Sequence, residues 1–340
     1  MKKCCICLLA IIIVTCMNSS IFANDSVTSS SSISKTKELS EVYNLTDEEI
    51  KGLETFPDEV KNEIEDCLKK HPNSVEITHQ VCEVDEIGEI QKIAQSNIKE
   101  LQQQGMTKKE AKDIKNEIED IQDMKKNKLI QEYNMTKSEA TLLKEAVKES
   151  ETKEKYKEID EKDKCSASGS ISSKKMSCSL VKYNNSKYKK GKKINSNYEI
   201  LTSYQWKKEP IFVGASDKMV FAWGGGFDIT TISSQATYRY FSPGKNRYVY
   251  FSAKPSTDEK INKGMIYTFK QKKNQAKIYS AYARFKLYQG KNKNYSTKVI
   301  SRYAHKILSI SGGISIGKTP SIEIGWGYDE SKQLKAGLIR

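Results

Sequence analysis

The feature that most constrains the fold is a succession of short alternating segments in residues 165–340. β-branched or aromatic residues occupy every second position in most of them, and turn-forming residues separate many of them. No helical period interrupts the series, which predicts an antiparallel all-β domain, either a sandwich or a barrel. The predicted strands span residues 198–206, 218–223, 227–241, 248–253, 265–271, 277–288, 296–303, 307–311, 314–317 and 321–328.

Several of the separating turns have a clear physical basis. Ser242–Asn246 contains proline, glycine and asparagine, and Gln289–Asn292 contains glycine and asparagine. Glycine and asparagine tolerate a positive φ, and proline fixes φ near the value that a turn needs. By the same reasoning, the glycine pair at 312 and 313 predicts a two-residue hairpin between segments 307–311 and 314–317.

The start of the chain has the pattern of a secretory signal peptide. Two lysines precede an apolar run from Cys4 to Val14, and a small residue, Ala23, ends the segment. We expect cleavage after residue 23 and therefore a secreted protein, released or associated with the cell surface. A lipoprotein attachment at Cys16 is an alternative, although the residues before it fit that motif poorly. The lysine-, asparagine- and isoleucine-rich composition indicates an AT-rich, bacterial genome.

Export changes how the cysteines are interpreted. Four of the eight cysteines lie in the signal peptide, and an even number outside the cytosol suggests disulfides. We predict the pairs Cys67–Cys82 and Cys165–Cys178, because the members of each pair are near in sequence; free thiols are the alternative. Each bridge would contribute about 3 kcal/mol on a loop-entropy model. The spacings differ from zinc-binding patterns, so no metal site or cofactor is predicted.

The segment between the signal peptide and the β region is acidic and mainly helical in its periodicity. Residues 24–37 are rich in serine and threonine and are predicted to be a disordered lead-in. Residues 38–147 predict a small bundle of short helices, and residues 148–164, with few apolar side chains, predict a charged linker. Capping boxes, each a threonine followed three residues later by a glutamate, mark three helix starts: Thr46, Thr107 and Thr136. The fold class is therefore α+β, with an N-terminal helical bundle followed by an antiparallel β domain.

Charge is distributed unequally between the two halves. Residues 165–340 hold 27 lysines, five arginines and nine acidic residues, a net charge of +23, whereas residues 24–164 hold 23 basic and 34 acidic residues, a net charge of −11. Such a basic domain attracts polyanions through long-range forces and counterion release. The predicted partners are an anionic cell-surface polymer or lipid headgroups, with nucleic acid as a further polyanion. The acidic half either contacts and masks the basic half or only balances its charge for solubility.

Basic residues gather in three places that alternate with aromatic residues. We predict that these residues bind the polyanion, by ion pairing and stacking. The alternative is that the lysines protect exposed strand edges from aggregation. The predicted binding residues are Lys187, Lys189, Lys190, Lys192 and Lys193, then Lys270, Lys272 and Lys273, then Arg284 and Lys286.

No enzyme signature stands out, so we predict a protein without catalytic residues. Residues 312–319 match the P-loop string, but strand-like alternation follows them where a phosphate-binding loop needs a helix. The three histidines are His71, His79 and His305, spread over both halves, and they suggest no catalytic triad. An enzyme of unrecognised type is a third possibility.

One segment supports a different class of function. Residues 227–241 are rich in serine and threonine and resemble in composition the hairpins with which β-pore formers enter membranes. The alternative function is therefore a membrane-active protein, similar to a bacteriocin or a pore-forming toxin, with the helical half as a propiece.

Overall fold

A computed structural model describes most of the chain after the lead-in. The predicted signal peptide, residues 24–37, nearly all of the predicted linker and Cys165 lie outside the described residues. The described residues are 40, 42–133, 135–148, 174–190, 192–212, 215–261, 263–274, 276–289, 297–308, 311–317, 319–331 and 333–338.

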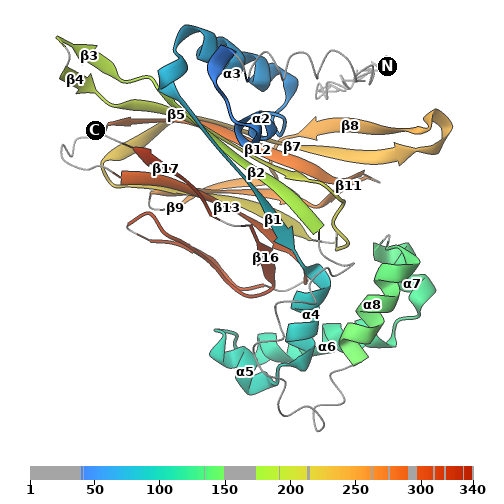
Figure 1. Ribbon diagram of the computed structural model, residues 1–340. Coiled ribbons are helices and arrows are strands. Elements are labelled where there is room, and N and C mark those ends of the chain that lie inside the picture. Colours follow the sequence, from blue (N-terminus) through green and yellow to red (C-terminus); the bar gives the residue numbers. More distant parts are fainter. Residues whose placement is uncertain are drawn as a thin grey trace, which may run out of the picture.

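Helices in the N-terminal region are followed by antiparallel sheets stacked as a sandwich (Figure 1), which confirms the predicted fold class. The larger sheet has the order β1 (Val75–Val84), β2 (Lys174–Asn184), β5 (Asn197–Trp206), β12 (Ala276–Gln289), β7 (Phe227–Ser242) and β8 (Arg247–Ala253), with β11 (Lys272–Lys273) paired to β12. The smaller sheet has the order β16 (Tyr328–Glu330), β13 (Thr297–Lys306), β6 (Ser216–Trp223), β10 (Gly264–Lys270) and β9 (Thr257–Ile261), with β17 (Leu334–Leu338) paired to β13. Two further hairpins join β3 (Lys187–Lys189) to β4 (Lys192–Asn195) and β14 (Ile314–Ile316) to β15 (Ile322–Ile324).

The main core lies between the two sheets and follows from the alternation along the strands. Successive side chains of a strand point to opposite faces, so every second residue faces the partner sheet. Phe221 and Trp223 of β6 and Phe285 of β12 are almost fully buried there, and the rings of Phe221 and Phe285 are 5.1 Å apart in an edge-to-face arrangement. Large aromatic side chains of this kind supply much of the stability of a sandwich.

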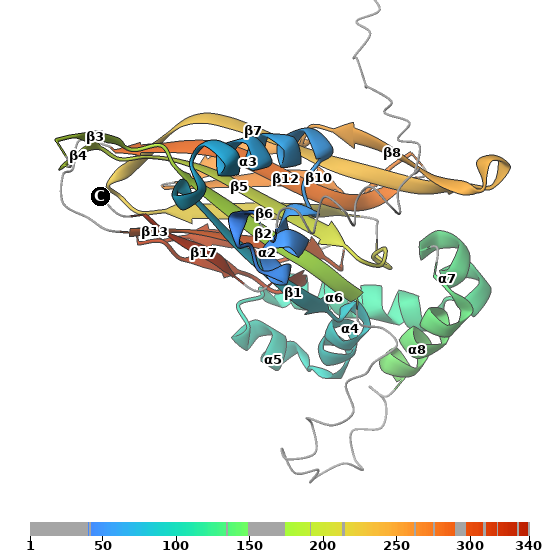
Figure 2. The same cartoon turned by 45° about the horizontal axis from the view of Figure 1, so that its top comes forward.

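Two groups of helices cover different parts of the sandwich (Figures 1 and 2). Helices α2 (Asp47–Leu53) and α3 (Asp58–Lys70) cover the outer face of the larger sheet, where Ile64 packs with Val181 and Leu201. The second group packs at one end of the sandwich against Phe212 and Ile307 and contains α4 (Glu86–Gln95), α5 (Ile98–Gln103), α6 (Lys108–Asp123), α7 (Lys126–Tyr133) and α8 (Lys137–Lys148). All three predicted capping boxes are present: Thr46 with Glu49, Thr107 with Glu110 and Thr136 with Glu139.

Strand β1 is an unpredicted part of the N-terminal region. It pairs with β2 over ten residues, from Val75 opposite Tyr183 to Val84 opposite Lys174. The helical region therefore contributes the edge strand of the larger sheet and is built into the β domain through backbone hydrogen bonds. A fragment that begins after the linker would lack this strand.

The predicted hairpin at Gly312 and Gly313 is wrong. β14 pairs with β15 and not with residues 307–311, and Ile307 and Leu308 instead pack against the helices at the end of the sandwich. The P-loop string accordingly falls in a β-hairpin, with a strand after it, as expected for a chance match.

Candidate anion-binding site

The structure separates the three predicted basic clusters. Residues 187–193 belong to the β3–β4 hairpin at one end of the sandwich, and residues 270–273 lie at the opposite end, beside β11 (Figure 1). Arg284 and Lys286 lie on β12, on the face covered by α3. The predicted binding residues therefore do not form one surface.

The cluster on β12 is neutralised within the chain. Arg284 forms ion pairs with Glu199 of β5 and Glu63 of α3, and Lys286 Nζ lies 3.8 Å from a carboxylate oxygen of Glu199. In addition, Lys182 pairs with Glu76 of β1. Because Glu63 and Glu76 belong to the acidic half, these two ion pairs are direct contacts between the acidic and basic halves.

The cluster at the opposite end keeps its charge. Lys270, Lys272 and Lys273 are exposed and form no ion pair with any residue that the structure describes. Lys207 and Lys208, which follow β5, are exposed at the same end of the larger sheet. Among the described residues, positive charge thus exceeds negative charge at this end of the sandwich, where Glu209 pairs with Arg239.

A pocket of about 430 Å³ opens at this end and contains two more lysines. Lys218 comes from β6 and Lys306 from the end of β13, and these strands are neighbours in the smaller sheet. Lys218 faces outward because the residues on either side of it, Asp217 and Met219, face the core. The remaining lining residues are Ala215, Ser216, Ser311, Gly312 and Tyr328.

Strand register extends the pocket into a row of lysines. Lys270 of β10 lies opposite Ser216, and residues directly opposite each other in an antiparallel pair point to the same side of the sheet. Ser216 and Lys218 share that side. Lys270, Lys218 and Lys306 therefore follow one another across three adjacent strands, and we call these three residues the lysine row.

The electrostatics of the pocket favour an anion. Burial lowers the pKa of Lys306, and the positive charge of Lys218 lowers it further, whereas Glu117 of α6 acts in the opposite direction. Neither Lys218 nor Lys306 forms an ion pair with a described carboxylate, and Lys218 Nζ lies 5.9 Å from the ring centroid of Tyr328. An anion between the two ammonium groups would relieve their repulsion, so the pocket can hold a phosphate, sulfate or carboxylate group.

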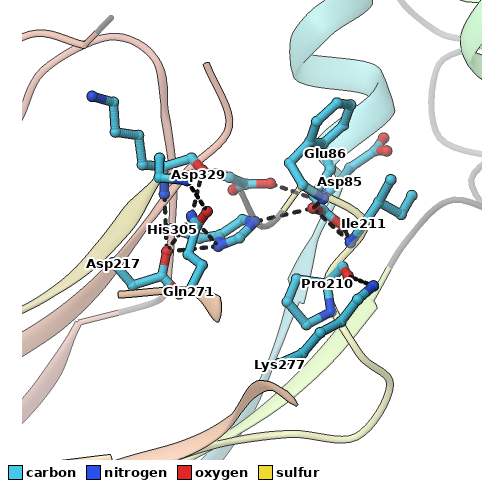
Figure 3. Close-up of polar contacts among 12 residues, drawn as sticks. Asp85, Glu86, Pro210, Ile211, Asp217, Gln271, Lys277, His305 and Asp329 are labelled. Atoms are coloured by element: carbon cyan, nitrogen blue, oxygen red, sulfur yellow. Dashed lines mark hydrogen bonds and ion pairs between the residues drawn. The ribbon is translucent and has the colours of Figure 1, made fainter. Parts of the chain in front are cut away.

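A buried network of charged residues joins Glu86, Asp217 and His305 (Figure 3). His305 donates from Nε2 to Glu86 at 3.0 Å and from Nδ1 to Asp217 at 2.8 Å, and all three side chains are inaccessible to solvent. Burial lowers the pKa of His305, but the two carboxylates outweigh it and raise the pKa to about 10. The imidazole is therefore a cation held between two anions.

This network fastens α4 and Lys306 to the sandwich. Glu86, in the first turn of α4, also accepts hydrogen bonds from the backbone amides of Ile211 and Phe212 at 2.8–2.9 Å. On the other side, Asp217 accepts a hydrogen bond from the amide of Lys306 at 3.2 Å, and Gln271 donates to the carbonyl of Lys306. Because the network is closed to solvent and hydrogen-bonded to the backbone of Ile211, Phe212 and Lys306, it positions these segments.

Sequence reasoning missed this network, although the strand periodicity contained a signal for it. Asp217 and His305 occupy the same face of their strands as the core residues Met219 and Tyr303, and a charged residue at such a position requires a buried partner. Glu86 could not be assigned as that partner, because it lies 131 positions from Asp217 and its segment was expected to belong to another domain.

The cysteines are arranged differently from the prediction. Cys67 lies with the residues between α3 and the outer face of the larger sheet, whereas Cys82 lies in the core between the sheets, so the structure does not bring this pair together. Instead, the Sγ atoms of Cys82 and Cys178 are 3.2 Å apart. Cys165 lies outside the described residues, and its pairing stays a prediction.

Two further properties of the described segments bear on function. Within them, no group of three or more histidine, cysteine, aspartate or glutamate side chains is arranged to hold a metal ion. Likewise, no helix in the ranges given above is long and apolar enough to cross a membrane.

Comparison with known proteins gives only distant matches. No family model and no curated protein matches the chain. Among solved structures, the N-terminal domain of the Streptococcus gordonii adhesin Sgo0707 is similar at a TM-score of 0.25 and 9% identity, over 42% of this chain and 28% of that one. The collagen-binding domain of the Erysipelothrix rhusiopathiae surface protein RspB reaches 0.24 and 9%, over 49% and 66% of the two chains. AvmM, which catalyses macrocyclization in alchivemycin A biosynthesis, reaches 0.21 and 9%, over 46% and 94%. Likenesses at this level assign neither a family nor a function.

Proposed function

We propose that this chain is a secreted, non-enzymatic binding protein that holds an anionic cell-surface polymer or lipid through the lysine row. The observation that carries this proposal is the pocket in which Lys218 and Lys306 stand side by side without a carboxylate partner among the described residues. Elsewhere in the β domain, Arg284 and Lys182 are neutralised by the chain itself. An external anion therefore gains the most favourable electrostatic energy by binding to Lys218 and Lys306, beside the exposed Lys270.

The acidic half neutralises only part of the basic domain in this proposal. Glu63 and Glu76 compensate two basic residues on the larger sheet, and the lysine row on the smaller sheet forms no ion pair with the described helices. Because β1 is a strand of the larger sheet, removal of the helical region as a propiece would take the edge strand out of that sheet. The intact mature chain therefore binds without prior cleavage.

The test compares two variants of the mature chain, residues 24–340, in binding to polyphosphate. Changing the lysine row (Lys270→Gln, Lys218→Gln and Lys306→Gln) is expected to weaken binding at low salt by about tenfold or more. It should also reduce the slope of log K against log salt by about 2, because up to three contacts are lost. The control changes three exposed lysines of α5 and α6 and should alter the affinity by less than about threefold: Lys99→Gln, Lys108→Gln and Lys109→Gln.

Equal losses in the two variants would show that net charge alone directs binding and would refute the lysine row. Absence of binding by the unmodified chain to polyphosphate, to anionic vesicles and to cell-wall polymer would refute the function itself. Both variants should be compared with the unmodified chain for their urea midpoints, so that a folding defect is recognised.

A further inference from the structure

The hairpin formed by β7 and β8 extends beyond the neighbouring strands of the larger sheet (Figures 1 and 2). Its strands remain paired to the end, with Tyr240 opposite Val249 and Phe241 opposite Tyr248. A short 3-10 turn, Pro243–Lys245, closes the hairpin, and Asn246 follows it with a φ of 48°, a left-handed conformation that asparagine tolerates. The tip is thus an ordered projection.

The tip exposes large aromatic side chains on both of its faces. Tyr240, Phe241 and Tyr248 are exposed to 36%, 48% and 45%, and they are half of the exposed large hydrophobic residues in the described chain. Consecutive residues of a strand point to opposite faces, so Tyr240 lies on one face and Phe241 with Tyr248 on the other. Grouped aromatic exposure of this kind marks an interaction site more often than scattered single residues do.

A stack of rings and one guanidinium group holds the tip in place. The Arg239 guanidinium carbon lies 4.7 Å from the ring centroid of Tyr248 and 4.4 Å from that of Tyr279. Its Nε donates to Glu209 at 3.1 Å, and the rings of Phe241 and Tyr248 meet edge to face at 5.5 Å. Because the rings of Phe241 and Tyr248 are already fixed by these contacts, binding through them costs little conformational entropy.

The charge around the tip is positive. The twelve residues from Arg239 to Tyr250 contain three basic and no acidic residues, and one of the three, Arg239, is paired with Glu209. Lys272 and Lys273 are exposed on β11, and their partner strand β12 pairs with β7 at the base of the hairpin, where Lys277 lies opposite Arg239. Tyrosine and phenylalanine bordered by lysine and arginine are typical of the interface between an anionic bilayer and water.

We propose that this hairpin tip inserts Tyr240, Phe241 and Tyr248 into the headgroup region of an anionic lipid bilayer. The inference rests on the proposed function for the electrostatic attraction, and it specifies a lipid surface as the partner. A carbohydrate chain would stack on a flat row of rings on one face, whereas rings on both faces of a projecting tip are all buried when the tip enters a fluid interface. The aromatic contact is short-ranged and adds to the attraction exerted by the lysines.

The experiment uses the full mature chain and vesicles that contain 30% anionic lipid. The double variant Phe241→Ser with Tyr248→Ser should lose vesicle affinity by about tenfold to a hundredfold, because two partly exposed rings no longer leave water. Its binding to soluble polyphosphate should stay within about twofold of that of the unmodified chain. Tyr288→Ser is the matched control, because Tyr288 is also exposed, at 38%, but lies at the opposite end of β12.

A second measurement does not depend on a loss of binding. In Phe241→Trp, the emission added to that of the three native tryptophans should be quenched by lipids brominated near the headgroup once vesicles are present. An unquenched tryptophan, together with unchanged vesicle affinity of the double variant, would overturn the inference. If the lysine-row variant still lost polyphosphate binding in that case, the proposed function would stand alone.

Two other outcomes are equally decisive. Parallel loss of vesicle and polyphosphate binding in a folded double variant would show that the tip contacts polyanions in general, and it would refute a lipid-specific role. Failure of the unmodified chain to bind vesicles would refute the lipid inference, and failure to bind polyphosphate and cell-wall polymer as well would also refute the proposed function.

Discussion

Replacing Glu86 by alanine tests the buried network that joins α4 to the sandwich. The carboxylate accepts from the amides of Ile211 and Phe212 and from the His305 imidazole, so the variant leaves three buried donors without this acceptor. Each such donor costs about 1–3 kcal/mol, and removing one partner of a buried ion pair costs about 3–5 kcal/mol. These costs overlap, because they concern the same groups. We therefore expect a loss of about 4 kcal/mol in the free energy of unfolding.

Urea unfolding followed by circular dichroism measures this loss. With an m value of about 3 kcal/mol/M, the midpoint should fall by more than about 1 M. Glu89→Ala is the control, because Glu89 lies one turn further along α4 and forms its ion pair among the described residues with the exposed Lys92, at 3.5 Å. That pair contributes about 0–1 kcal/mol. Equal midpoints for the two variants would refute the assignment of Glu86 as the anchor of α4.

Three further predictions concern pH, redox state and truncation. Because the pKa of His305 is raised to about 10 in the folded chain, its stabilising charge is fully present below about pH 6.5, and the stability advantage of the unmodified chain over His305→Gln should shrink as the pH rises through about 10. An advantage that grew over this range would contradict that sign. Oxidised glutathione should convert the thiols of Cys82 and Cys178 into one disulfide and release two molecules of glutathione, since their Sγ atoms are adjacent. Peptide mapping that found a Cys67–Cys82 bridge would contradict the predicted Cys82–Cys178 disulfide. Residues 165–340 alone should unfold at lower urea than residues 42–340, because the fragment lacks β1, and equal midpoints would show that β1 is dispensable.

The strands that the sequence predicted well carry aromatic or aliphatic side chains at most of their core-facing positions. Segment 277–288 is observed as Ala276–Gln289 and segment 198–206 as Asn197–Trp206, although β12 has two register shifts and β5 is buried on both faces. β1 was not recognised, because Val75–Val84 mixes histidine, glutamine and threonine with its apolar residues and lies between helices. Only the tertiary structure shows that it is the edge strand of the larger sheet.

The candidate site depended on strand order, which local patterns do not encode. Lys218 and Lys306 are 88 positions apart, and they become neighbours because β6 pairs with β13 across a connection that contains most of the larger sheet's later strands. Of the basic residues predicted from the sequence to bind a polyanion, Lys270 belongs to the lysine row. Arg284 instead forms ion pairs with Glu199 and Glu63. The sequence therefore indicates where positive residues are concentrated, but it does not show which of them form ion pairs with carboxylates in the folded chain.

The central claim is that the sandwich presents uncompensated positive charge to an anionic partner outside the cell. The most direct measurement is the affinity of the intact mature chain for anionic vesicles as a function of salt between 50 and 300 mM. We expect tight binding at low salt, a steep fall in affinity that is linear in log K against log salt, and weak binding to neutral vesicles. Affinity that is independent of salt, or equal for neutral and anionic vesicles, would contradict the central claim.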